Sequence, residues 1–345
     1  MNRRLWIGLF AVVVGSFALL GYFGGEVYRK APPIPGAVVD ESGNVLFTRD
    51  DILTGQQVWQ SAGGQQLGSI WGHGAYVAPD WSADWLHREA TGLLDRFAKA
   101  EGFDGAADLP PERRAGLAER MKAQMRSNTF DLKRDVVVVS AARAGVMKDV
   151  AAHYAGLFGA APELEHLREA YAMPDDAIPD ATRREKLGAF FWWTSWACAT
   201  ERAPGGVTYT NNWPHEPLVG NTPSAANVLW SIVSVVVLLA GVGALVWYFA
   251  AKKREEPPLK PPEKDPLDGF RATPSMRAVA FFVAAVVLLF LVQIVLGIVT
   301  AHYGVEGRGF YGFDLAAILP YAVSRTWHVQ LGVFWIATAF LGAGL

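Results

Sequence analysis

Four long apolar runs without Asp, Glu, Lys or Arg constrain the fold of this chain more than any other feature. The runs cover Leu5–Gly25, Pro217–Ala251, Ala278–Ala301 and Thr326–Leu345. A helix needs about 20 apolar residues to cross the hydrocarbon core of a bilayer, and lipid leaves no partner for unpaired backbone amides. The chain is therefore predicted to be an all-α membrane protein. After an N-terminal span, further spans are expected at about residues 225–251, 278–301 and 326–345.

The positions of the basic residues predict how these helices are oriented. Arg3-Arg4 precedes the first run, Lys252-Lys253-Arg254 follows the second, and Arg277 precedes the third. If the spans alternate in direction, all these residues lie on one side, which the positive-inside rule identifies as cytoplasmic. The first run is longer than the apolar part of a secretory signal, usually about 7–15 residues, so we expect an uncleaved anchor.

The apolar runs divide the chain into three predicted parts. Residues 1–25 form a transmembrane anchor, residues 26–216 an extracytoplasmic domain, and residues 217–345 the start of a larger transmembrane domain. The last run reaches Leu345 without a basic or polar tail. We therefore expect a truncated bundle that continues in a longer protein.

The extracytoplasmic domain is predicted to be mainly helical. A β-hairpin is expected around Glu41-Ser42-Gly43, and Val136–Val139 predicts a short strand. Helices are expected from Asp50 or Asp51 to about Ser61, from Trp81, after Pro111, and over Ser140–Phe158 and Ala181–Ala199. The aromatic residues in Phe190–Trp196 favour a helix packed against the membrane domain. A net charge of −2 gives no indication of a nucleic-acid partner.

The cysteine content limits the redox chemistry of the chain. Cys198 is the single cysteine in the sequence, so neither an internal disulfide nor a C-x-x-C-H motif for covalent haem is present. Cys198 lies among small and aromatic residues, and a buried structural role is the simpler interpretation.

His328 lies one short turn inside the last apolar run, in Arg325-Thr326-Trp327-His328-Val329-Gln330-Leu331. An ionisable residue in a membrane span is expensive and suggests a functional site. A neutral imidazole that faces the interior of a helical bundle is suited to ligate a haem iron. The alternative is a histidine at the headgroup level beside Trp327 and Arg325, and position alone does not decide between the two.

Two further patterns lie near the outer membrane face. His302 and Glu306 are spaced to share one face if the turn is helical, and such a pair can accept the protons that a hydroquinone releases. The alternative is a solvated loop. The glycine-rich loop Gly72–Asp80 could present backbone carbonyls to Ca²⁺ or dock against a partner surface.

Several motifs together resemble the N-terminal part of the quinol-dependent nitric oxide reductases, single-chain members of the haem–copper oxidase superfamily. The matching motifs are Thr54-Gly55-Gln56-Gln57-Val58-Trp59-Gln60, Trp71–Trp81, Phe191-Trp192-Trp193, Tyr209-Thr210-Asn211-Asn212-Trp213-Pro214, Phe310-Tyr311-Gly312-Phe313-Asp314 and Arg325–Leu331. They follow the family's order over nearly the whole chain. The resemblance implies an anchor helix and a cytochrome-c-like domain, followed by the first three helices of a haem–copper oxidase-like bundle.

The same resemblance implies that the cytochrome-c-like domain lacks haem c. The stretch Gly64–Gly68 corresponds to the C-x-x-C-H region in the cytochrome c subunit of the related cytochrome-dependent enzymes, but it contains neither cysteine nor histidine. By resemblance, His328 is an axial ligand of the low-spin haem b, and His302 and Glu306 lie near bound quinol. The backbone carbonyls of Gly74 and Tyr76 correspond to positions that help to hold a calcium ion in related cytochrome-dependent enzymes.

The implied reaction couples two NO molecules to N₂O and water with two electrons and two protons from quinol. The implied cofactors are haem b, haem b₃, non-haem iron and calcium. The ligands of haem b₃ and of the non-haem iron are expected beyond Leu345, so this fragment would be the electron-input half of a denitrification enzyme. Its histidines are His73, His87, His153, His166, His215, His302 and His328.

The implied surroundings are the bacterial cytoplasmic (inner) membrane, with the large domain on the periplasmic side. The expected partners are a membrane quinol, NO and lipid, without a cytochrome c electron donor; whether the protein forms a homodimer is left open. A function from a different class is also compatible with the fragment. It would then be a non-catalytic, membrane-anchored module for docking or sensing.

Overall fold

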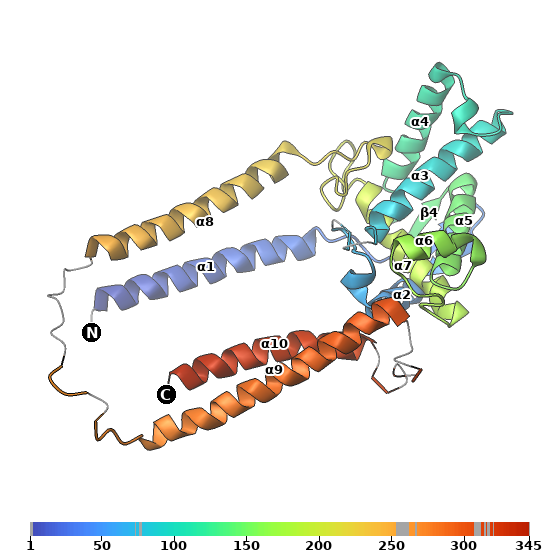
Figure 1. Cartoon of the computed structure of the whole chain (residues 1–345). Helices are drawn as coiled ribbons and strands as arrows, with labels where there is room; N and C mark the ends of the chain where they lie inside the picture. The colour runs from blue at the N-terminus through green and yellow to red at the C-terminus, as the bar shows by residue number, and fades with distance from the viewer. Residues whose placement is uncertain are drawn as a thin grey trace. The chain divides into compact units, whose positions relative to one another are not determined.

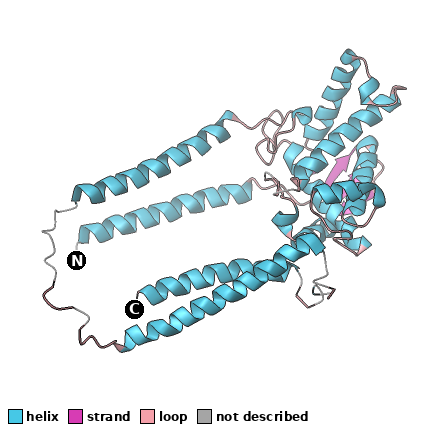
Figure 2. Ribbon diagram, viewed as in Figure 1, coloured by secondary structure: helices cyan, strands magenta, loops and turns pink. Residues whose placement is uncertain are grey.

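The computed structural model is mainly helical, as predicted (Figures 1 and 2). It describes residues 3–72, 74–75, 78–252, 262–265, 268–306, 312–313, 315, 318–319 and 321–344. The chain divides into two compact units. The first comprises residues 1–59, 64–165 and 178–223, and the second comprises residues 60–63, 166–177 and 224–345.

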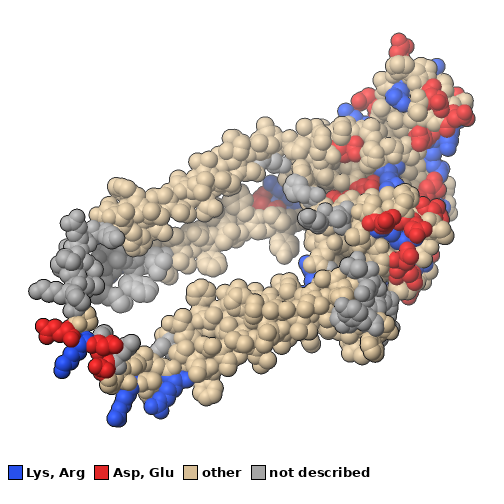
Figure 3. Space-filling model, viewed as in Figure 1, with Lys and Arg blue, Asp and Glu red and all other residues tan. Residues whose placement is uncertain are grey.

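Three helices in the described part of the chain are long and apolar enough to cross a membrane. These helices are α1 (Arg3–Arg29), α8 (Ala225–Lys252) and α9 (Pro274–Glu306). Their apolar windows are Phe10–Arg29, Val228–Lys252 and Pro274–His302. On the face shown in Figure 3, these helices carry few charged side chains, which gather instead over the part of the first unit outside α1 and over the stretch around residue 265. The chain is therefore a membrane protein.

The fourth predicted span corresponds to α10 (Tyr321–Ala343). By length and composition α10 is not one of the three candidate spans in the described part of the chain, so its crossing of the membrane stays a prediction. His328 and Gln330 interrupt its apolar character, and α10 packs along α9. Ser324 on this interface is fully buried.

The first unit contains a small sheet with the strand order β2-β1-β4-β3. Its strands are β1 (Ala37–Asp40), β2 (Val45–Thr48), β3 (Phe130–Asp131) and β4 (Val136–Val139). The hairpin β1–β2 and the short β4 are both predicted by the sequence. The structure adds a parallel pairing of β1 with β4, in which Val38 lies opposite Val137.

Most of the first unit is helical. Besides α1, its helices are α2 (Arg49–Ser61), α3 (Trp81–Ala100), α4 (Pro111–Arg126), α5 (Ala141–Leu157) and α7 (Ala181–Ala199). The short α6 (Glu165–Ala170) belongs to the second unit from His166 onward, as do the last two residues of α2. Each of α3, α5 and α7 begins after a capping side chain, from Asp80, Ser140 and Asp180 respectively.

The core of the first unit is aromatic, and α7 runs through its centre. Trp81 stacks on Phe191 with ring centroids 5.6 Å apart, and Trp85 stacks on Tyr154 at 5.4 Å. The aromatic run of α7 therefore packs against α3 and α5 inside its own unit. Because these side chains are buried within their own unit, α7 needs no membrane partner to cover them.

Candidate functional site

The helices α9 and α10 are joined by a row of polar contacts. Thr300 Oγ1 and Ser324 Oγ lie 2.9 Å apart, and Ser324 Oγ also donates to the backbone carbonyl of Leu296 at 3.2 Å. Small and hydroxylated side chains let membrane helices approach closely and hydrogen-bond to one another. This row brings the sequence-predicted His328 against α9.

The ring of His328 lies on the backbone of α9. Its Nδ1 is 2.9 Å from the backbone carbonyl oxygen of Gln293. A Cβ added to Gly297 would lie only 2.8 Å from His328 Cε1, so the missing side chain at Gly297 makes room for the ring. A carbonyl can only accept a hydrogen bond, so Nδ1 carries a proton, and in the neutral ring Nε2 retains its lone pair. Among the described residues, no hydrogen-bond partner of Nε2 is found.

This arrangement suits a metal-ligating histidine. Such histidines usually donate their second ring nitrogen to a carbonyl or carboxylate, which fixes the tautomer and the ring orientation. His328 meets that requirement through Gln293. The donor chemistry therefore fits a haem iron at Nε2. Within the described part of the chain, no three His, Cys, Asp or Glu residues converge on a metal site.

The second predicted pair lies at the end of α9. His302 is half-buried, and the helical backbone continues through Glu306. The two positions are therefore one helical turn apart, which is the condition that the quinol prediction requires. The side chain of Glu306 lies outside the described residues.

The glycine-rich loop before α3 is organised by Asp80. This carboxylate is 6% exposed and accepts hydrogen bonds from Ser69 Oγ and Gly72 N, both at 2.7 Å. Ser69 Oγ in turn accepts from Gly74 N at 2.7 Å. Gly74 adopts φ +93°, where a side chain would be strained. The backbone amides of Gly72 and Gly74 are therefore held in place by Asp80 and Ser69, while His73 and Tyr76 lie outside the described residues.

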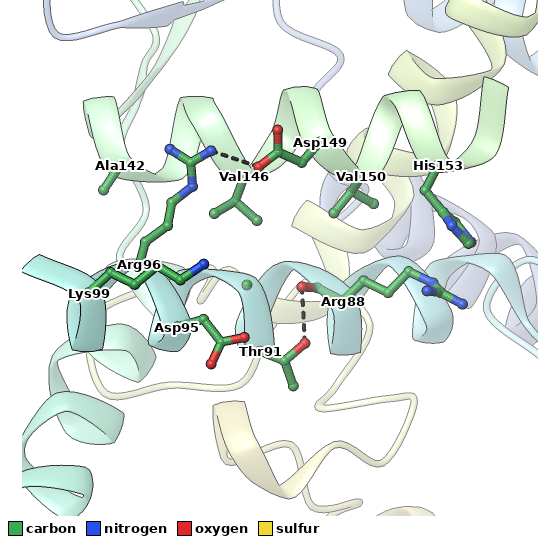
Figure 4. Close-up of a pocket in the computed structure, with 11 residues that line it drawn as sticks. Arg88, Thr91, Asp95, Arg96, Lys99, Ala142, Val146, Asp149, Val150 and His153 are labelled. Carbon is green, nitrogen blue, oxygen red and sulfur yellow. Dashed lines mark hydrogen bonds and ion pairs between the residues drawn. The ribbon is translucent and has the colours of Figure 1, made fainter. Parts of the chain in front are cut away.

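A groove of about 780 Å³ lies between α3 and α5 and is lined by charged side chains (Figure 4). Arg96 bridges it to Asp149 at 2.6 Å, and Arg88 pairs with Asp84 at 2.8 Å. Burial, with the charge of Arg88, lowers the pKa of His153 at one end. The guanidinium charges are thus largely compensated, and the groove offers no concentrated anion site.

The comparison with known protein families matches residues 35–215 to one model. That model describes the cytochrome c-like domain of NorB, a nitric oxide reductase protein. It covers more than half of the chain. The chain belongs to the NorB family of nitric oxide reductases. A comparison with curated proteins finds no match.

The sequence of the cytochrome c-like domain contains no C-x-x-C-H motif. Gly64–Leu67, the stretch aligned by resemblance with the C-x-x-C-H region, forms a short 3-10 helix. Cys198 is fully buried in α7, and burial raises the pKa of its thiol far above the ordinary range. This supports the structural role predicted for Cys198.

Sequence reasoning missed the α9 side of the candidate site. Gln293, Gly297 and Thr300 lie in an apolar run that carries no motif of its own. Glycines in such runs are a weak signal of close helix packing. They do not indicate which residue of another helix they contact.

Proposed function

We propose that this chain is the electron-input half of a quinol-dependent nitric oxide reductase. Membership of the NorB family supports the reaction class. The observation that carries the quinol assignment is the cytochrome c-like domain without a C-x-x-C-H motif. A domain that cannot attach haem c cannot relay electrons from a soluble cytochrome, so a membrane quinol is the proposed donor.

In this proposal His328 binds the iron of haem b through Nε2. Its Nδ1 donates to Gln293 O at 2.9 Å and fixes the ring in the tautomer that ligation needs. Haem b, when bound, supplies a one-electron carrier between quinol and the site of NO reduction. The neighbouring Gly297 gives the imidazole the space to adopt this orientation.

His302 and Glu306 are proposed to receive the two protons that leave the quinol hydroxyls. Oxidation of quinol to quinone would release these two protons together with two electrons. The overall balance is two NO, two electrons and two protons giving N₂O and water. Haem b₃ and the non-haem iron would be held by residues other than those named above.

Two further elements belong to the same proposal. The backbone carbonyls of Gly74 and Tyr76 would contribute to a calcium site, for which the fixed Ser69–Asp80–Gly74 contacts provide a rigid support. The anchored domain would lie on the periplasmic side of a bacterial inner membrane. NO, quinol and lipid would be its partners, with no cytochrome c donor.

The decisive test is a reduced-minus-oxidised spectrum of the full-length protein. We expect a low-spin b-type signal that His328→Ala removes and that His166→Ala, at an exposed histidine of α6, leaves intact. A signal that survives His328→Ala would refute the ligand assignment. The absence of any b-type signal would instead favour a non-catalytic docking or sensing module.

A second test separates quinol oxidation from NO reduction. Glu306→Ala should slow quinol oxidation by roughly tenfold or more while NO reduction with an artificial donor stays close to wild type. Glu112→Ala, at an exposed position of α4, is the matched control. An unchanged quinol rate in Glu306→Ala would remove this residue from the proposed site.

A further inference from the structure

Gln293 contacts α10 at two points that no motif in the sequence indicates. Its backbone carbonyl accepts from His328 Nδ1 at 2.9 Å. Its side-chain Oε1 accepts from Trp335 Nε1 at 2.6 Å. One residue of α9 therefore holds two positions of α10 that lie about two helical turns apart.

The packing around the Gln293 amide leaves it little freedom. A Cβ added to Gly332 would lie 2.8 Å from Gln293 Nε2, so the amide occupies the space that the glycine leaves open. Trp335 is itself fixed by an edge-to-face contact with Phe290, with ring centroids 5.5 Å apart. Both sides of the amide–indole hydrogen bond are thus held by neighbouring groups.

An amide inside an apolar helix is costly unless its polar atoms are bonded. Helix packing alone would be met by an apolar side chain of similar size, as elsewhere along α9. The polar residue here is Gln293, and its own backbone carbonyl also accepts the hydrogen bond from the His328 imidazole. On the other side of His328, Thr300 and Ser324 form a second polar contact at 2.9 Å. His328 is bracketed by interhelical hydrogen bonds in both directions along the helix pair.

We propose that Gln293 is a positioning residue for the haem ligand, with Trp335 holding its side chain. The Trp335–Gln293 hydrogen bond fixes the register of α10 against α9 on one side of His328. This keeps the Gln293 carbonyl aligned with His328 Nδ1. It thereby fixes the direction in which His328 Nε2 points. The inference rests on the proposed function, because it takes His328 to be the ligand.

Two substitutions remove this hydrogen bond from opposite ends in the full-length protein. Trp335→Phe deletes the indole N–H and keeps an aromatic ring against Phe290. Gln293→Leu deletes the amide and keeps the backbone carbonyl that receives His328. Trp247→Phe is the matched control, because this tryptophan lies on α8 and is 70% exposed. A third variant, Gly332→Ala, displaces the amide by steric contact without removing any polar group.

We expect haem b to remain bound in each variant but with a broadened or split low-spin electron paramagnetic resonance signal. Loss of haem to a scavenger protein should accelerate by roughly fivefold, the effect of one net hydrogen bond. The double variant Trp335→Phe/Gln293→Leu should match the single variants, because all three lose the same interaction. Trp247→Phe should be indistinguishable from wild type.

The spectra distinguish positioning from simple helix packing. If Trp335→Phe and Gln293→Leu lower the unfolding temperature but leave the low-spin signal and haem loss unchanged, Gln293 is only a packing residue and the proposal fails. The proposed function has its own readout. A low-spin signal that persists in His328→Ala refutes the ligand assignment, whatever the other variants show.

Discussion

The buried ion pair of Glu89 and Arg143 offers the sharpest test of how the cytochrome c-like domain is held together. Glu89 is fully buried on α3 and Arg143 is 3% exposed on α5. Arg143 Nε donates to Glu89 Oε1 at 2.5 Å, and Trp85 Nε1 donates to Glu89 Oε2 at 2.8 Å. The substitution Arg143→Met removes the positive charge and keeps much of the side-chain volume.

The expected cost follows from the burial of the remaining charge. Breaking a buried pair by removing one partner costs about 3–5 kcal/mol, because the other charge is left without compensation. In a domain of this size, 1 kcal/mol corresponds to about 2–4 °C of unfolding temperature. Arg143→Met should therefore lower the unfolding temperature of the domain by roughly 6–20 °C.

The pH dependence of the stability loss in Arg143→Met tests whether the unpaired charge of Glu89 causes that loss. The orphaned Glu89 carboxylate of Arg143→Met can reduce its burial cost by taking up a proton, so the loss should be smaller near pH 5 than near pH 8. Replacing both residues, as in Glu89→Gln/Arg143→Met, should recover part of the loss, because no charge is then buried alone. Thermal unfolding followed by tryptophan fluorescence measures all three variants. A deficit in Arg143→Met that is constant from pH 5 to pH 8 would refute the reasoning.

Further predictions concern the same domain. Burial lowers the pKa of His153 below its ordinary value of 6.5, so the unfolded chain takes up a proton first as the pH falls. Stability should decline below about pH 6.5, and His153→Gln should flatten that decline in a pH series of unfolding temperatures. Gly55→Ala places a Cβ 2.1 Å from a backbone carbonyl of α7 and should cost about 1–3 kcal/mol. Gly116→Ala, where nothing lies within 4 Å, should instead stabilise by about 0.5–1 kcal/mol. Cys198 should resist a maleimide at pH 8 in the native protein and react after unfolding, because it is buried and its thiol pKa is raised; rapid native labelling would contradict this.

The helices of the domain were predictable because their signals are local. Asp80 caps α3 through Ala83 N at 3.0 Å, and the apolar residues after it recur at helical spacing. The predicted face of Trp85, Leu93 and Phe97 is buried in the structure. Such elements are specified by neighbours within one or two turns, which is the range that sequence patterns report.

The sheet was predicted only in part, because its central pairing is non-local. The hairpin of β1 and β2 follows from a turn between two short apolar stretches. The parallel pairing of Val38 with Val137 joins segments that are far apart in the sequence. Four consecutive valines predict a strand in β4, but they do not identify which strand lies beside it.

The candidate site shows the same limit inside the membrane part of the chain. The pattern around His328 indicates an unusual polar residue in an apolar helix, and the sequence predicts its metal-ligating role by resemblance. Its partner could not be predicted, because the acceptor is the backbone carbonyl of Gln293, and every residue of α9 carries such a carbonyl. What selects position 293 is the absence of a side chain at Gly297, one turn further along the helix. The sequence does not distinguish a glycine that faces lipid from one that makes room for an imidazole. Gly297 makes room for His328 only because contacts such as Thr300–Ser324 place α10 in register with α9.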